Sequence, residues 1–156
     1  MITINVVCVG NLKEKFWQDA TREYEKRISA FAKINVVEVK ESEYGTSEKD
    51  ILCAKQQEAK RLESHKKGFS IALEVNGKSF DSESFAGYIQ DLANRGVSQI
   101  TFFVGGSFGL DSDFSKQTNQ QLSFSKFTFP HQMMRVILLE QIYRAFTILN
   151  NKTYHK

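Results

Sequence analysis

A glycine-rich stretch in the last third of the chain has the residue types of a ligand-binding loop. Gly105, Gly106 and Gly109 directly follow an apolar run, within the segment ITFFVGGSFGLDSDF (100–114). Glycines tolerate positive φ angles and, lacking a β-carbon, they let a ligand lie against the main chain. The alternative is a tight turn that merely requires glycine, and from the glycines alone the two interpretations are about equally expected.

Two common phosphate-binding patterns are missing around these glycines. A G-x-x-x-x-G-K-[ST] loop would place a lysine on the phosphates, and a dinucleotide-binding loop would read G-x-G-x-x-G. The sequence contains neither pattern. The glycine stretch therefore favours a ligand without phosphate, such as one recognised through backbone amides around an adenine.

A second candidate stretch, LSFSKFTFP (122–130), alternates apolar residues with small hydroxyl residues. Such a loop can offer both apolar contacts and hydrogen bonds to a flat ring. An ordinary strand shows the same alternation, and the pattern alone favours that interpretation.

Cysteines and histidines do not form a metal-ligand pattern. Cys8 and Cys53 are far apart in the sequence and belong to no Cys-x-x-Cys motif, so we expect two core thiols in a reducing compartment. His65, His131 and His155 are too scattered to form a ligand set. We therefore predict no structural metal.

Length and composition favour one domain over residues 1–156. The chain has 41% hydrophobic and 25% charged residues, enough for one core and too short for two domains. The sequence begins without a basic leader and has no apolar run of about 18 residues. We therefore expect a soluble, unexported, cytoplasmic protein that does not contact a membrane.

Positive charge is concentrated at the C-terminal end. Residues 115–156 contain six basic residues and one acid, Glu140, whereas the remainder contains 15 basic and 17 acidic residues. This distribution is typical of a polyanion-binding surface. Lysines on a solvated helix face would give the same distribution, and charge alone does not separate the two.

Strand-like and helical segments alternate along the chain. Strands are predicted at 2–9, 34–39, 69–75, 99–104 and, weakly, 120–125, with a turn at Asn76-Gly77-Lys78. Helices are predicted at 16–31, 46–65, 82–96, 111–116 and 130–151. This order predicts a Rossmann-like, three-layer α/β sandwich with a mainly parallel sheet, and ligands of such sheets bind beyond the carboxyl ends of the strands.

The last helix is apolar around almost its whole circumference. A helix of this kind must be covered on more than one side, so we expect the sheet on one side and a second, two-fold related subunit on the other. Arg135 falls in the middle of the main apolar stripe and needs a carboxylate or an interface. A buried intrachain salt bridge is the alternative explanation for Arg135.

Three segments together resemble a known family. VGGSFGL, LSFSKFTFPHQMMRVILLEQIYRA and the terminal YHK are similar to the SPOUT methyltransferases, and specifically to the ribosomal large-subunit methyltransferase H family. The resemblance runs from VGNLKEKFW to the last residue and is strongest over the final 60 or so residues. It implies an α/β fold with a C-terminal trefoil knot, a homodimer, and S-adenosylmethionine as methyl donor for N3 of a pseudouridine in 23S ribosomal RNA.

The family's cofactor contacts carry over to specific positions of this sequence: Leu73, Gly105, Leu122, Ser123, Phe124, Ser125, Lys126 and Phe127. Two positions depart from the family pattern. Phe108 stands where relatives usually carry a smaller or polar residue, and Phe127 stands where methionine is common.

The resemblance also implies roles for the basic C-terminal end. Because the donor's sulfonium is cationic, lysines and arginines are expected on the rim of the site, with Arg135, Arg144 and Lys156 holding RNA phosphates. Tyr154 or His155 is expected to receive or orient the N3 proton, although the ordinary expectation for such a tail is a frayed terminus. The substrate is expected to be ribosomal RNA within the assembled ribosome. A SPOUT enzyme acting on transfer RNA and a non-catalytic RNA-binding module remain alternatives.

Overall fold

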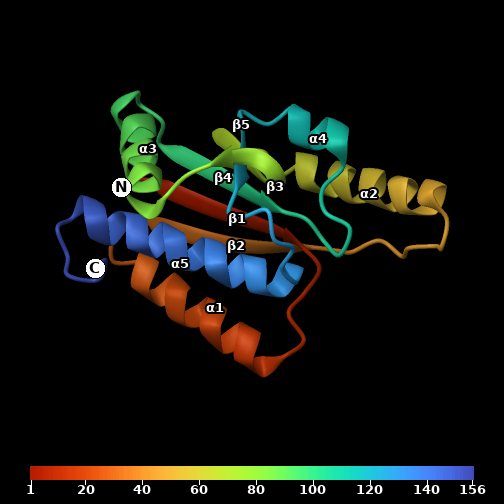
Figure 1. Ribbon diagram of the computed structural model, residues 1–156, viewed down its shortest axis with the longest axis horizontal. Helices are drawn as coiled ribbons and strands as arrows, with labels where there is room; N and C mark the ends of the chain where they lie inside the picture. The colour runs from red at the N-terminus through yellow and green to blue at the C-terminus, as the bar shows by residue number, and fades with distance from the viewer.

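Five parallel strands form the central sheet in the computed structural model, which describes residues 1–156 (Figure 1). Their order across the sheet is β2-β1-β4-β3-β5. The bounds are β1 Thr3–Val9, β2 Lys33–Val39, β3 Phe69–Ser79, β4 Gln99–Val104 and β5 Gln120–Ser123. The predicted α/β class with a parallel sheet is confirmed, and every strand pair in the sheet is parallel.

Helices cover both faces of the sheet and complete the three layers. The helices are α1 Lys15–Ile28, α2 Glu48–Glu63, α3 Ser82–Asn94, α4 Ser112–Lys116 and α5 His131–Leu149. On one face α5 lies between α1 and α3, while α2 and α4 lie on the other face (Figure 1).

The alternation of β1 side chains shows how the core is divided. Ile4, Val6 and Cys8 belong to the larger apolar cluster beneath α1, α3 and α5, whereas Val7 and Val9 belong to the smaller one beneath α2 and α4. Successive side chains of a strand point to opposite faces, so a strand covered on both sides is mostly apolar, and the buried Asn5 of β1 has a hydrogen-bond partner in Thr101.

The two cysteines have different environments. Cys8 is buried as predicted, whereas Cys53 is exposed, so the expectation of a second core thiol is wrong. The helix α2 packs through Ala54, Glu58 and Leu62, which recur at intervals of four, and Cys53 lies beside this buried stripe.

Capping residues place the predicted helix ends. Ser47 precedes α2, where its hydroxyl accepts from the amide of Asp50 at 3.1 Å and the Asp50 carboxylate accepts from the amide of Ser47. At the end of α3, Gly96 adopts a positive φ of 84°, which supports its predicted role in ending that helix.

The turn predicted at Asn76-Gly77-Lys78 is wrong, because β3 continues through these residues to Ser79. The pairing of β3 with β5 shifts register between Leu73 and Lys78, which marks an irregularity inside the strand. A β-carbon on Gly77 would lie 2.7 Å from the amide nitrogen of Leu122. Gly77 is therefore needed for the close approach of β5 rather than for a chain reversal.

Neighbouring helices cover much of the apolar surface of α5. The sheet, α1 and α3 contact it, and Arg135, Leu138, Leu139 and Ile142 are among its buried residues. The side chains of Met133, Val136 and Ile137 stay partly exposed. From the sequence we expected the sheet to cover one side of this helix and a second subunit to cover the other. In the structure α1 and α3 cover much of the surface that was expected to face the second subunit.

None of the helices combines the length and the apolar character needed to cross a bilayer. No group of three or more His, Cys, Asp and Glu side chains has an arrangement that could hold a metal ion.

Candidate functional site

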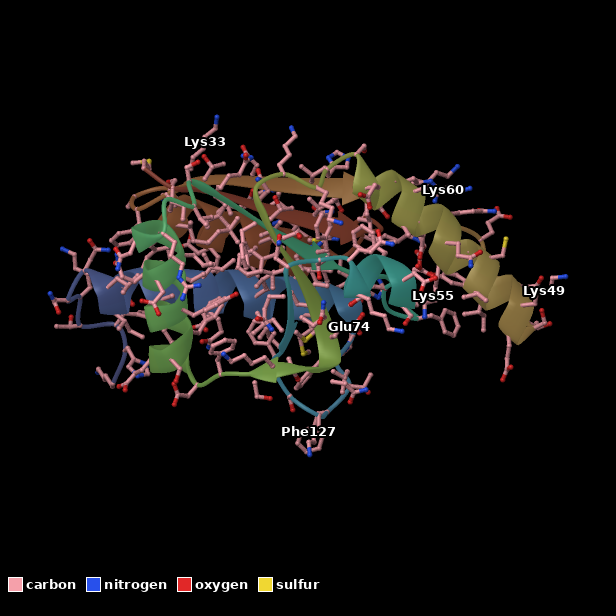
Figure 2. All side chains as sticks on the ribbon, turned by 90° about the horizontal axis from the view of Figure 1, so that it is seen from above. Lys33, Lys49, Lys55, Lys60, Glu74 and Phe127 are labelled. Atoms are coloured by element: carbon pink, nitrogen blue, oxygen red, sulfur yellow. The ribbon has the colours of Figure 1, made fainter.

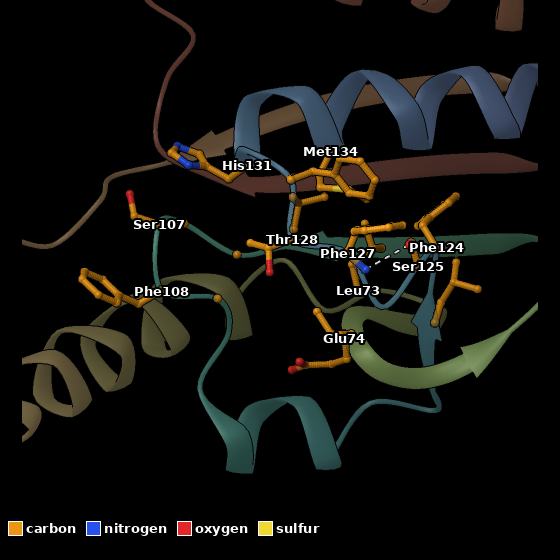
Figure 3. Close-up of a pocket in the computed structure, with 17 residues that line it drawn as sticks. Leu73, Glu74, Ser107, Phe108, Phe124, Ser125, Phe127, Thr128, His131 and Met134 are labelled. Atoms are coloured by element: carbon orange, nitrogen blue, oxygen red, sulfur yellow. Dashed lines mark hydrogen bonds between the residues drawn. The ribbon is translucent and has the colours of Figure 1, made fainter.

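A pocket of about 370 Å³ opens at the carboxyl ends of β4 and β5, beside the point where β3 becomes irregular after Leu73. Its walls come from residues 73–75 in the middle of β3, from residues 104–109 at the end of β4 and after it, and from residues 122–134 between the end of β5 and the start of α5 (Figure 3). Parallel α/β sheets bind ligands at this edge, because the loops from several strands converge there.

Six of the eight predicted cofactor contacts line this pocket: Leu73, Gly105, Leu122, Phe124, Ser125 and Phe127. Ser123 and Lys126 do not line it. The Ser123 hydroxyl instead donates to the carbonyl of Val75 at 2.8 Å, which holds the chain after β5 against β3. Ser123 therefore supports the wall of the pocket, and the binding roles of all eight residues stay predictions.

The glycine loop, residues 105–109, folds tightly back on itself. The amide of Gly109 donates to the carbonyl of Gly106 at 3.0 Å, and Gly109 alone of the three glycines has a positive φ, 79°. A β-carbon on Gly105 would lie 2.5 Å from the carbonyl carbon of Gly109. Gly105 is thus required by the turn itself, which is the simpler of the two interpretations of the glycines.

Two side chains of the β2–α2 connection hold the glycine loop in place. The Ser107 hydroxyl donates to the Glu41 carboxylate at 3.2 Å, and the Phe108 and Tyr44 rings lie with centroids 4.7 Å apart. The Tyr44 hydroxyl in turn donates to the buried Glu58 carboxylate at 2.6 Å. Burial, followed by this bond to Glu58, raises the pKa of Tyr44 well above its ordinary value, so the phenol stays a neutral donor.

Sequence reasoning missed several pocket residues. Glu74, His131 and Met134 all line the pocket, yet each lies in or beside an ordinary strand or helix pattern and carries no motif of its own. The lining includes no Lys or Arg, and Glu74 is its only acid. A ligand held here meets apolar walls and one carboxylate rather than positive charge.

The sequence of this chain matches a known protein family over almost its whole length. The family described as "Predicted SPOUT methyltransferase" matches residues 2–155. The chain belongs to the SPOUT methyltransferase family. The resemblance inferred from the three sequence segments is confirmed.

Relatives of this SPOUT methyltransferase match it over almost its full length. A protein named ribosomal RNA large subunit methyltransferase H from Clostridium novyi (strain NT) is 47% identical, covering 99% of this chain and 100% of its own. One of the same name from Bifidobacterium animalis subsp. lactis is 46% identical with the same coverage. A methylase family protein of known structure from Neisseria gonorrhoeae superposes with a TM-score of 0.51 at 10% identity, over 91% of this chain and 81% of its own, which supports the fold alone.

The burial of Arg135 in this SPOUT methyltransferase contradicts the expected RNA contact. Its side chain is only 2% exposed, its Nη1 donates to Glu38 at 2.9 Å, and its Nη2 donates to the Gly10 carbonyl at 3.0 Å. A guanidinium enclosed and bonded in this way cannot reach a phosphate. Arg135 forms the intrachain salt bridge that the sequence allowed as the alternative.

The predicted catalytic tail of this SPOUT methyltransferase does not line its own pocket. The Tyr154 hydroxyl donates to Glu140 at 3.1 Å, and His155 Nδ1 lies 3.2 Å from Nη1 of Arg144. The tail therefore packs along the middle and C-terminal half of α5, whereas His131 and Met134 in its first turns line the pocket. Glu140 and Arg144 lie six and ten residues after Met134 in the pocket wall, about 9 and 15 Å along α5, and neither Tyr154 nor His155 lines the pocket of its own chain.

The two remaining predicted RNA contacts are near this tail. Arg144 Nε donates to Glu140 at 3.0 Å, and this bond, more than any other cause, raises the arginine's pKa. Lys156 is exposed at the end of the chain. Both stay predictions, with Arg144 already paired to a carboxylate.

Proposed function

We propose that this SPOUT methyltransferase transfers a methyl group from S-adenosylmethionine to N3 of a pseudouridine in 23S ribosomal RNA. The observation that carries the proposal is the convergence of six sequence-predicted cofactor positions on one pocket at the carboxyl edge of the sheet. The full-length similarity to proteins named ribosomal RNA large subunit methyltransferase H supports the choice of substrate.

The residues of the pocket fit a cationic donor with a flat ring. Leu73, Leu122, Phe124 and Met134 supply apolar walls, while main-chain groups of the glycine loop face the same space. No Lys or Arg lines the pocket, so nothing there repels a sulfonium, and Glu74 attracts it. When bound, S-adenosylmethionine supplies an electrophilic methyl group on sulfur.

The reaction needs positioning more than acid or base strength from the pocket. The bond between sulfur and the methyl carbon breaks as the bond from N3 to that carbon forms, the sulfur keeps the electron pair, and the N3 proton leaves. An attacking atom held in line at about 3 to 3.5 Å gains much of the achievable acceleration. The apolar pocket walls are suited to this task because they fix orientation and exclude water.

The proton must pass to a group near the acceptor base, and the tail residues can serve if two subunits combine. Within one chain Tyr154 and His155 contact Glu140 and Arg144 of α5 and do not line the pocket. In a homodimer with antiparallel α5 helices, packed through Met133, Val136 and Ile137, each tail would lie beside the other subunit's pocket. The dimer would then have two equivalent sites, each made of the pocket of one subunit and the tail of the other.

The experiment that tests the proposal offers labelled S-adenosylmethionine with three acceptors: assembled ribosomes, isolated 23S ribosomal RNA and bulk transfer RNA. We expect label in 23S ribosomal RNA, greatest with assembled ribosomes, and N3-methylpseudouridine on mapping the nucleotide. Label confined to transfer RNA would select the SPOUT enzyme acting on that RNA. Failure to bind S-adenosylmethionine would select the non-catalytic RNA-binding module. A ribosomal substrate would place the protein in the cytoplasm.

A further inference from the structure

The Phe108 side chain is an apolar ring that stays in water at the rim of the pocket. It lines the pocket, yet 50% of its surface is exposed. Figure 3 shows Phe108 on the same side of the pocket as Ser107 and His131, away from Phe124 and Ser125. An exposed ring beside a binding pocket is a candidate contact for a ligand that arrives from solvent.

The position of this ring is fixed by contacts on its other side. Phe108 lies in the tight turn closed by Gly106 and Gly109, and its ring packs against Tyr44 at an interplanar angle of 49°. Tyr44 is anchored through its hydroxyl to Glu58, which is only 2% exposed and also accepts from the amide of Ser42 at 3.1 Å. The exposed face of Phe108 is therefore preorganised.

The other exposed ring at the pocket lacks such support. Phe127 is 78% exposed and has no aromatic neighbour, and it projects from the body of the protein (Figure 2). Its backbone amide is held by the Ser125 hydroxyl at 3.0 Å, but nothing comparable to Tyr44 fixes its ring. Because the Phe108 ring is already held by Tyr44, it would lose less rotamer freedom than Phe127 when a flat ligand stacks on it.

We propose that Phe108, supported by Tyr44, is the stacking surface for the nucleobase that receives the methyl group. RNA-modifying and RNA-binding proteins recognise an unstacked base by stacking it on an aromatic side chain, because every base has a π face. This inference rests on the proposed function and adds a substrate-binding role for a residue that departs from the family pattern. The deeper apolar walls remain for the donor.

The test compares four variants by kcat/KM for ribosomes and by donor affinity in calorimetry. Phe108→Ala should lower kcat/KM roughly 5- to 100-fold while the donor Kd changes less than about 2-fold. Phe108→Leu keeps apolar volume but removes the π face and should lose nearly as much, whereas Phe108→Trp should retain activity. The matched control is Phe16→Ala, because Phe16 is 63% exposed and packs beside Trp17 but does not line the pocket.

Several results would overturn the inference while leaving the proposed function in place. Wild-type methylation of RNA with unchanged kcat/KM in Phe108→Ala, or full activity in Phe108→Leu, would remove the stacking role. A large rise in the donor Kd would assign the ring to the donor instead. Conversion to monomers in light scattering would assign it to a contact between subunits. By contrast, absence of methyl transfer in the wild-type protein would reject the proposed function itself.

Discussion

Arg135 and Glu38 form a 2.9 Å ion pair that joins the first turns of α5 to β2. The same Glu38 oxygen accepts from the amide of Leu12 at 3.1 Å, and Arg135 also donates to the carbonyl of Gly10. One pair therefore ties the β1–α1 connection to β2 and α5. Burial raises the pKa of the neighbouring Cys8 thiol to about 12, so this cysteine remains protonated beside the pair.

Replacing Arg135 with Met should destabilise the fold rather than weaken RNA binding specifically. Arg135 is buried but Glu38 is 43% exposed and can be solvated once the arginine is gone, so the expected loss is about 1–3 kcal/mol, mainly from the Gly10 carbonyl that loses its donor. Urea unfolding measures the loss. Arg22→Met is the matched control, because its 3.8 Å pair with Asp19 is exposed and should contribute less than about 1 kcal/mol. Unchanged stability with lost RNA affinity would restore the RNA-binding role.

Three glycine-to-alanine substitutions should show which glycines are required by close backbone contacts and which have room for a side chain. Gly105→Ala and Gly77→Ala would place a β-carbon within 3 Å of backbone atoms, so each should destabilise the protein by about 1–3 kcal/mol. Gly87→Ala in α3 meets nothing within 4 Å and should be neutral or stabilise by up to about 1 kcal/mol. Thermal unfolding of the three variants measures this order, and equal Tm values would contradict the packing described at Gly105 and Gly77.

These glycines also show what the sequence can and cannot predict. Periodicity and caps predicted the parallel sheet and most helix ends, because those signals are local. The Asn76-Gly77-Lys78 segment has the composition of a turn, but its glycine serves a contact with Leu122, about 45 residues away in the sequence. A composition signal cannot distinguish a turn from a close approach between distant strands.

The candidate site also has features that the sequence could predict and features that it could not. Six of the residues that the resemblance named line one pocket, whereas Glu41 and Tyr44 reach the glycine loop only because β2 and β4 both pair with β1. Arg135 was ambiguous because its partner, Glu38, lies 97 positions away. The separation of Tyr154 and His155 from the pocket follows from the length and direction of α5, and no motif encodes that direction.

The charge of Glu74 should affect the affinity for S-adenosylmethionine more than the affinity for its demethylated product. Glu74→Lys should weaken S-adenosylmethionine binding roughly 3- to 10-fold, because a cation would then face the sulfonium, on the order of 1 kcal/mol at a partly solvated site. S-adenosylhomocysteine has a neutral sulfur and should lose much less affinity. Calorimetry with both ligands tests the difference, with Glu63→Lys as a control outside the pocket. Equal losses for the two ligands would place Glu74 away from the sulfur.

Tyr154 should orient the reaction without acting as its base. Burial, followed by hydrogen bonds to Tyr24 and Glu140, raises the pKa of Tyr154 from 10.0 to about 12. A raised pKa favours the protonated phenol in the folded state, so its contribution to stability is present below about pH 10 and is lost as pH rises through about 12.

The pH–rate profile of Tyr154→Phe tests this role. The variant should be slower than the wild-type protein while keeping the same apparent pKa values between about pH 6 and 9. Disappearance of a limb of the profile in this variant would mean that Tyr154 does titrate during the reaction.

A mixed dimer tests whether the tail acts on the partner's pocket. One subunit would lack residues 154–156, and the other would carry Leu73→Arg, which places a cation in the pocket. Each homodimer should be inactive. The mixed dimer should recover about half of the wild-type activity per dimer, since it contains one intact pocket facing one intact tail. An inactive mixed dimer that still binds the donor at one pocket would show that the tail acts within its own chain.

The most direct measurement of the central claim is a crystal structure of the protein with S-adenosylmethionine, combined with mapping of the methylated nucleotide in ribosomes treated with the same preparation. We predict the donor between Leu73, the glycine loop and Leu122, and N3-methylpseudouridine in 23S ribosomal RNA. A donor bound elsewhere on the molecule, or ribosomes left without a new methyl group, would contradict the account.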